Sequence, residues 1–98
     1  MPDGSALWRL AGFEFHLDVW IELEKPDQDL INDVLAWLIA RADDPYQGVA
    51  REPGFDNLWH GRIPGTSRAG ATVVCSYFIV EREHLVRCNA IATLNWPA

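Results

Sequence analysis

Three side chains that can act on a phosphate ester share one face of a predicted sheet, namely His60, Arg62 and Arg87. Histidine exchanges a proton near neutral pH, and guanidinium groups stabilise the charge of a phosphate under attack. We therefore predict these three residues as a catalytic set. The alternative is a polar sheet face that only contacts water, and the residue types are compatible with both interpretations.

Three further residues are candidates for holding a ligand, namely Arg68, Arg82 and Asn89. Asn89 lies on the same predicted face as the catalytic set and can position a ligand by hydrogen bonds. Arg68 belongs to the glycine-rich segment GTSRAG at residues 65–70, where amide groups and a guanidinium can bind an anion. This segment lacks the Gly-Lys-Ser/Thr ending of a P-loop and precedes a strand. A plain connection between two strands is therefore the favoured interpretation.

The histidine and cysteine spacings predict neither a metal site nor a disulfide. His16, His60 and His84 are dispersed, and the gap between Cys75 and Cys88 matches no zinc-binding spacing. Both cysteines fall on the predicted core side of their strands, where unreactive thiols are usual. We expect no metal and no cofactor.

The first half of the chain must supply the elements that cover the sheet. Residues 13–24 alternate apolar and polar side chains, which favours an antiparallel strand, with a shorter strand before it at 7–11. A helix at 17–25 is a competing interpretation. Asp27 is a good N-cap for a helix at 27–42, which Pro45 prevents from continuing.

The second half contains three predicted strands at 58–63, 71–82 and 85–95, with a turn at Glu83-His84. A two-residue turn pairs Ile79 with Cys88 and directs one set of side chains toward the helix: Val73, Cys75, Tyr77, Ile79, Val86, Cys88, Ala90, Ala92 and Leu94. The opposite set faces outward: Ser76, Phe78, Arg87, Asn89, Ile91, Thr93 and Asn95.

These elements predict an α+β fold, in which a single antiparallel sheet of four to five strands has one long helix packed on one face, in the order β(β)-α-β-β-β. With 98 residues we expect one domain over 1–98, with a flexible N-terminus at 1–6. Hydrophobic residues at 49% and charged residues at 22% exclude disordered and low-complexity classes. The chain has no readable secretory signal and no long apolar run, which favours a cytoplasmic location with reduced thiols.

The charge is divided unevenly along the chain. Residues 1–44 carry ten acids and three bases, whereas residues 45–98 carry four acids and five arginines, which gives the net charge of −6. A strongly acidic chain does not attract polyanions broadly, so nucleic-acid binding would need a local arginine cluster. Trp20, between Asp18 and Glu22, predicts an aromatic anchor on an acidic surface for a basic protein partner. A tryptophan that covers the helix is the equal alternative.

From Glu22 onward the chain resembles the RelE/ParE superfamily of small bacterial toxins. The resemblance rests on ELEKPDQDLINDVLAWLIARADDPY, on LWHGRIPG and on ATVVCSYFIVEREHLVRCNAIATL. It implies a toxin of a bacterial toxin–antitoxin pair that acts on messenger RNA at the ribosome or binds DNA gyrase, with a cognate antitoxin as partner. The matching site positions would be Arg62, Arg82 or Arg87, and His60 as acid/base.

The acidic first half supports a rival interpretation, in which the chain is a non-catalytic immunity or antitoxin-type protein that blocks a basic partner. A structural interaction protein without catalysis, or a phage-encoded one, is the third hypothesis. The toxin interpretation accounts better for the order of the elements, and the immunity interpretation accounts better for the net charge. The sequence leaves the choice open.

Overall fold

The computed structural model describes residues 7–95. Its elements are β1 (Arg9–Ala11), α1 (Phe13–Glu24), α2 (Gln28–Ala40), β2 (Ala50–Arg51), β3 (Leu58–Arg62), β4 (Ala71–Val80), the 3₁₀ turn η2 (Glu81–Glu83) and β5 (Leu85–Asn95). The expected flexible segment 1–6 lies outside the described residues.

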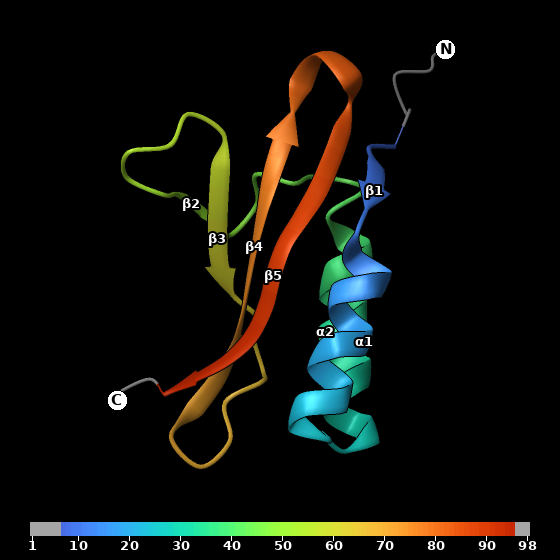
Figure 1. Cartoon of the computed structure of the whole chain (residues 1–98), viewed down its shortest axis with the longest axis vertical. Coiled ribbons are helices and arrows are strands. Elements are labelled where there is room, and N and C mark those ends of the chain that lie inside the picture. Colours follow the sequence, from blue (N-terminus) through green and yellow to red (C-terminus); the bar gives the residue numbers. More distant parts are fainter. Residues whose placement is uncertain (1–6, 96–98) are drawn as a thin grey trace.

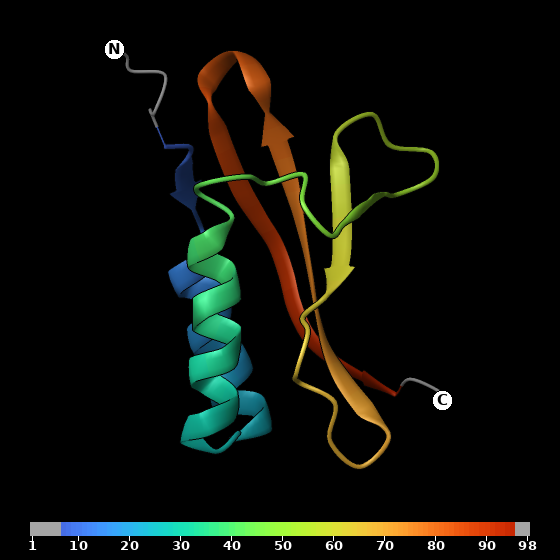
Figure 2. The same cartoon turned by 180° about the vertical axis from the view of Figure 1, so that it is seen from behind.

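One five-stranded sheet has the order β1-β5-β4-β3-β2 (Figure 1). All neighbouring strands are antiparallel except β1, which runs parallel to β5. The two helices lie side by side and pack against the sheet next to β5 (Figure 2). The predicted α+β class with a helix on one sheet face is therefore confirmed, although the sheet is mixed and carries two helices instead of one.

The predicted strand at 13–24 is wrong, because this segment forms α1. Its period-two pattern consists of two interleaved sets of apolar residues, each with a spacing of four. The set Phe13, Leu17, Ile21 faces the core, whereas the set Phe15, Val19, Leu23 faces solvent. Residues four apart lie on one helix face, so each set forms its own stripe. The competing helical interpretation of 17–25 was the better one.

The helix predicted at 27–42 is confirmed as α2. The Asp27 side chain accepts a hydrogen bond from the Leu30 amide at 2.8 Å, which satisfies one of the unpaired donors of the first turn. Lys25 adopts a left-handed conformation and ends α1, so only residues 25–27 connect the two helices. This short connection makes α1 and α2 an antiparallel hairpin.

Strands β3, β4 and β5 lie close to their predicted positions, but the predicted β4–β5 register is wrong. The loop spans residues 81–84 and not 83–84, so Ile79 faces Val86 and not Cys88. This shift of two residues keeps each side chain on its predicted face. Arg87 and Asn89 therefore still point outward.

An irregularity in the β4–β5 pairing then exchanges the two faces for the side chains in the last part of β5. Ser76 pairs with Ala90 while Tyr77 pairs with Cys88, so Asn89 is an extra residue in β5. Beyond this bulge Ile91 is buried on the helix side, contrary to its predicted outward position. The remaining corrections follow from the same bulge: Thr93 and Asn95 lie on the helix side of the sheet, and Ala90, Ala92 and Leu94 face outward.

The core lies between the helices and the inner face of the sheet. It contains Phe13, Trp20, Val34, Leu38, Ile63, Val73, Cys75, Tyr77, Ile79, Val86, Cys88 and Ile91. Trp37 and Trp59 pack against it, as predicted. A Cβ at Gly61 would lie 2.8 Å from Cγ1 of Val49, so only glycine lets the segment after α2 cross β3 this closely. Neither described helix is long and apolar enough to cross a bilayer.

Candidate functional site

The sheet face opposite the helices carries the candidate site, and we call it the outer face. It presents Leu58, His60 and Arg62 from β3, Ser76 and Phe78 from β4, and Arg87 and Asn89 from β5. These residues alternate with buried ones because the other sheet face packs against the helices. Arg62 and Arg87 are therefore on the same side of the sheet.

The distances across the outer face follow from the register. Arg62 pairs with Val74 and Arg87 with Phe78, so the two arginines are two strands and four residues apart. At about 4.8 Å per strand and 3.3 Å per residue, their Cα atoms lie roughly 16 Å apart. His60 and Arg62 are neighbours on one strand face. The face thus has one compact pair and a more distant second arginine, which an extended ligand can span.

His60 is held by a carboxylate from the loop after β2. Its Nδ1 is shielded from solvent and lies 3.3 Å from Oε1 of Glu52. His60 Nδ1 makes no hydrogen bond within the described residues, so Glu52 is a close neighbour and not a hydrogen-bond partner. A carboxylate beside Nδ1 favours the proton on that nitrogen and leaves Nε2 as the acceptor. In a neutral His60 with this proton on Nδ1, Nε2 would be free to accept a proton.

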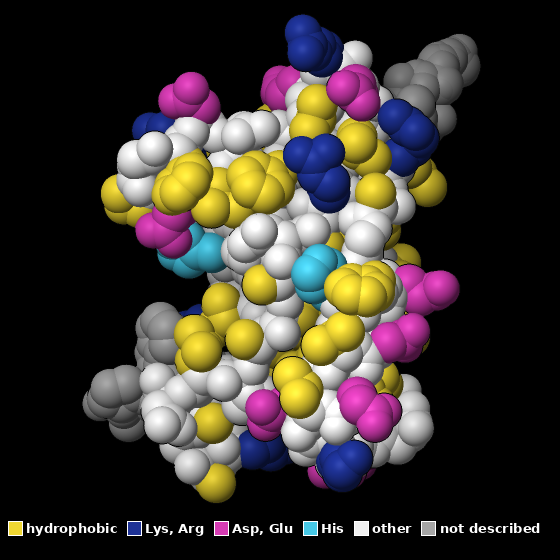
Figure 3. Space-filling model, viewed as in Figure 1, with side chains coloured by type: hydrophobic (Ala, Val, Ile, Leu, Met, Phe, Trp, Pro, Cys, Tyr) yellow, Lys and Arg dark blue, Asp and Glu magenta, His cyan; other side chains and the backbone are white. Residues whose placement is uncertain are grey.

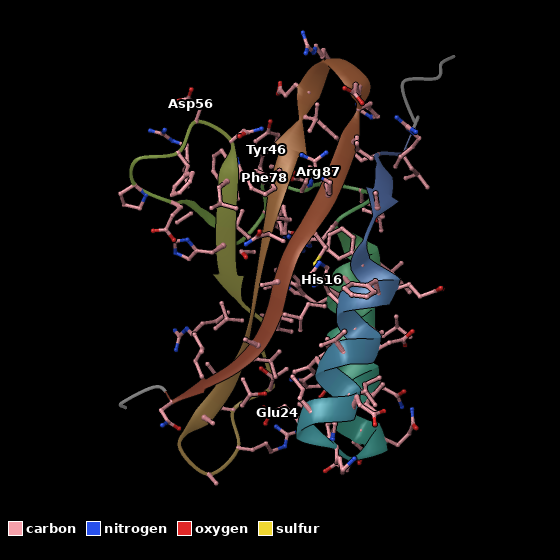
Figure 4. The ribbon with its side chains drawn as sticks, viewed as in Figure 1. His16, Glu24, Tyr46, Asp56, Phe78 and Arg87 are labelled. Carbon is pink, nitrogen blue, oxygen red and sulfur yellow. The ribbon has the colours of Figure 1, made fainter. Side chains whose placement is uncertain are left out.

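The middle and upper parts of the outer face contain two contacts between β4 and β5. Asn89 donates a hydrogen bond from Nδ2 to Oγ of Ser76 at 3.0 Å, next to His60 in the register. The Arg87 guanidinium lies 5.6 Å from the centre of the Phe78 ring, and Figure 4 shows both on the upper sheet. A guanidinium over an aromatic ring is restrained by cation–π attraction while its donors remain directed outward.

Arg9 is a further candidate residue that the sequence analysis missed. β1 runs parallel to β5 with Arg9 beside Leu85 and Ala11 beside Arg87, so Arg9 points to the outer face. It is exposed at the edge of the sheet. The expected strand at 7–11 was the available signal, but its partner strand was unknown.

The three central strands contain no aspartate or glutamate. Over β3, β4 and β5 the charged side chains are Arg62 and Arg87 alone, although the whole chain carries a net charge of −6. Figure 3 shows dark-blue side chains near the upper half of β5, with magenta ones beside them at the hairpin tip and along the helices. The chain therefore keeps a locally cationic face within an acidic protein, which an anionic ligand needs.

The candidate ligand residues Arg68 and Arg82 lie away from this centre. Arg68 donates to the carbonyl oxygens of Gly65 and Ser67 and lies 3.8 Å from Asp33 of α2, so it holds its own loop to the helix. Arg62 and this loop line a pocket of about 380 Å³. Arg82 lies in η2 at the tip of the β4–β5 hairpin.

The predicted partner surface of Asp18, Trp20 and Glu22 needs a correction. Trp20 is only 2% exposed, and its indole N–H donates to Oγ1 of Thr93 at 2.8 Å. It is a core residue of α1 that packs against β5, so it neither anchors a partner nor covers the end of the helix at 27–42 as a strand residue. Asp18 and Glu22 remain exposed, but the apolar residues beside them are Phe15, Val19 and Leu23.

The cysteines and histidines form no further site among residues 7–95. Cys75 and Cys88 are both buried free thiols. A hydrogen bond with Cys88, together with burial, raises the pKa of the Cys75 thiol well above its usual value. Within the described part of the chain, no three His, Cys, Asp or Glu side chains are grouped to hold a metal ion.

Comparison with solved structures shows what this arrangement resembles. The chain superimposes on the E. coli toxin RelE in the free state, in a mutant with two arginines replaced by alanine, with a TM-score of 0.62 over 88% of this chain and 82% of that one. The two sequences are 12% identical. No protein-family profile matches the sequence, and no curated protein matches it. The structural likeness establishes that this chain has a RelE-like α+β fold.

Proposed function

We propose that this chain is a RelE-like toxin of a toxin–antitoxin pair, and that its outer face binds and cleaves RNA. The observation that carries the proposal is the shared placement of His60, Arg62 and Arg87 on a face whose three central strands hold no carboxylate. The fold shared with the E. coli toxin RelE supports it. A cognate antitoxin would be the protein partner.

The chemistry of the proposed reaction assigns one task to each side chain. Nε2 of His60, whose Nδ1 lies beside Glu52, takes the proton from a ribose 2′-hydroxyl. The 2′-oxygen then forms a bond to phosphorus while the bond from phosphorus to the 5′-oxygen breaks, and the leaving oxygen takes a proton from water. Arg62 stabilises the negative charge that grows on the phosphate during this step. The products are a 2′,3′-cyclic phosphate and a 5′-hydroxyl.

Arg87 on β5 and Arg9 on β1 lie farther along the face, both in the same direction from Arg62, and would bind the RNA strand on one side of the reacting phosphate. The planar guanidinium of Arg87, 5.6 Å from the centre of the Phe78 ring, offers a surface for a base or two donors for a phosphate. Bases of single-stranded RNA are accessible for such stacking, unlike those within a helix. We therefore propose single-stranded RNA as the substrate.

The immunity-type function has weaker support from the structure. It relied on Trp20 as an aromatic anchor, and Trp20 is buried. It also gives no role to the placement of His60 against Glu52, beside three central strands that hold no carboxylate. We therefore place the toxin function first.

The test is induced expression in bacteria combined with cleavage of a single-stranded RNA by the purified protein. We expect growth arrest, and we expect His60→Ala to lower the cleavage rate by about 10²- to 10⁴-fold, the usual contribution of general-base catalysis. Arg62→Ala should lower the rate by about 10²- to 10³-fold. Both substitutions should also relieve the growth arrest.

Arg51→Ala is the matched control, because it removes an arginine whose position in β2 faces the other side of the sheet. It should retain both cleavage and growth arrest. The proposal fails if the wild-type protein cleaves no RNA and does not slow growth, or if Arg51→Ala loses as much activity as Arg62→Ala.

A further inference from the structure

An exposed apolar stripe on α1 is the least expected feature of the helical hairpin formed by α1 and α2. Phe15, Val19 and Leu23 are 66%, 40% and 74% exposed, and they follow one another at a spacing of four residues along one helix face. Scattered exposed apolar residues are normal, but a continuous row of large ones is typical of an interaction site. We call this row the α1 ridge.

A row of carboxylates runs parallel to the ridge. Glu14, Asp18 and Glu22 also repeat every four residues, and each precedes a ridge residue by one position, so their stripe is rotated by about 100° around the helix. Asp18 and Glu22 line a shallow groove together with the three ridge residues. Figure 3 shows yellow side chains descending along the helices with magenta ones beside them. Neither Asp18 nor Glu22 makes a side-chain hydrogen bond or ion pair within residues 7–95.

We infer that the α1 ridge binds an amphipathic helix of a partner protein, with apolar residues on one side and lysine or arginine beside them. The apolar stripe of the partner would pack along Phe15, Val19 and Leu23, as in other complexes in which a helix lies in a groove. Its cations would face Glu14, Asp18 and Glu22. The combination of an apolar row and an acidic row at the same spacing is what selects this partner.

Charge disfavours two other occupants of the α1 ridge. A second copy of this chain would bring Asp18 and Glu22 of one protomer against the same carboxylates of the other, and like charges at a contact are unfavourable. A membrane surface is usually anionic and binds amphipathic helices that carry lysine or arginine beside their apolar face. The carboxylates beside the α1 ridge have the opposite sign.

The inference goes beyond the proposed function, because it requires neither RNA binding nor cleavage. Its test uses a dye-labelled synthetic peptide of 18 residues, with leucines on one helical face and lysines elsewhere. We expect Phe15→Ser/Leu23→Ser to weaken peptide binding by about tenfold or more, as for central interface residues. Because the ridge is exposed, the variant should fold, which thermal unfolding checks. Asp18→Lys/Glu22→Lys should weaken binding similarly and abolish its dependence on salt.

Two controls distinguish specific binding of the peptide at the α1 ridge from general attraction of a cationic peptide to an acidic protein. Asp56→Lys makes the same kind of charge change on the loop before β3, far from α1 in Figure 4, and should leave the affinity within about twofold because that loop is remote. A peptide of identical composition but scrambled order, without an apolar face, should bind about tenfold more weakly.

Several results would overturn the inference. The inference fails if the scrambled peptide binds as tightly as the amphipathic one, or if Phe15→Ser/Leu23→Ser keeps the wild-type affinity. It also fails if Asp56→Lys weakens binding as much as Asp18→Lys/Glu22→Lys does. Sedimentation that shows a dimer of the wild type, dissociated by Phe15→Ser/Leu23→Ser, would assign the ridge to a second copy. Binding to phosphatidylserine vesicles through the ridge would assign it to a membrane.

Discussion

The helical hairpin and the outer face differ most clearly in the sign of their charge. Residues 13–40 carry seven carboxylates and one lysine, whereas β3, β4 and β5 carry two arginines and no carboxylate. The net charge of −6 therefore arises mainly from the helical hairpin, and it does not reflect the positive charge of the three central strands. The difference teaches that an acidic small protein can still present a locally cationic sheet face when its central strands contain no acids.

The hairpin and the sheet also differ in how each uses its apolar residues. The sheet buries one side and exposes a mixed polar side, with cations among small and aromatic residues. Helix α1 instead carries two apolar stripes and buries only one of them. We therefore relate the outer face to an anionic substrate and the α1 ridge to a protein partner.

The largest expected effect separates the two stripes of α1. Trp20→Ala should lower the free energy of unfolding by about 3–5 kcal/mol, because it leaves a cavity in the core and removes the hydrogen bond to Thr93. Phe15→Ala, on the same helix, should change it by less than about 0.5 kcal/mol, since the side chain is exposed. Chemical denaturation measures both values. Equal costs for the two variants would contradict the distinction between a buried and a free stripe.

A smaller change in stability distinguishes carboxylates that support the fold of the helical hairpin from carboxylates that are free to bind a partner. Asp27→Ala should cost about 1 kcal/mol of stability because Asp27 caps α2. Asp18→Ala should cost less than about 0.5 kcal/mol, since Asp18 is a surface residue without such a bond. Thermal unfolding of the two variants at the same pH makes the comparison. If Asp18→Ala were as costly as Asp27→Ala, the acidic row would have a structural role and not a binding role.

The strands of the outer face were predictable from the sequence for a simple reason. Each of β3, β4 and β5 buries one face only, so apolar and polar residues alternate and reveal which side chains lie together. His60, Arg62 and Arg87 were therefore placed on one face correctly. Helix α2 was equally predictable from the sequence, because Asp27 marks the start of the helix and the apolar stripe of the helix marks its buried side.

The remaining features depend on tertiary contacts that a local pattern does not contain. Two interleaved stripes with a spacing of four look like a strand, so α1 was predicted wrongly, and Trp20 was then assigned to the surface. The bulge at Asn89 reverses half of β5 without a sequence signal such as glycine. Arg9 joins the outer face only because β1 pairs with β5. Glu52 contacts His60 only because β2 pairs with β3.

The most direct test of this account is a titration of the protein with a short single-stranded RNA, followed by amide chemical shifts residue by residue. The account predicts that the perturbed amides cluster on the outer face, around Arg9, His60, Arg62 and Arg87, while those of the α1 ridge stay unchanged. Perturbations confined to the helical hairpin, or none at RNA concentrations that saturate a specific site, would contradict it.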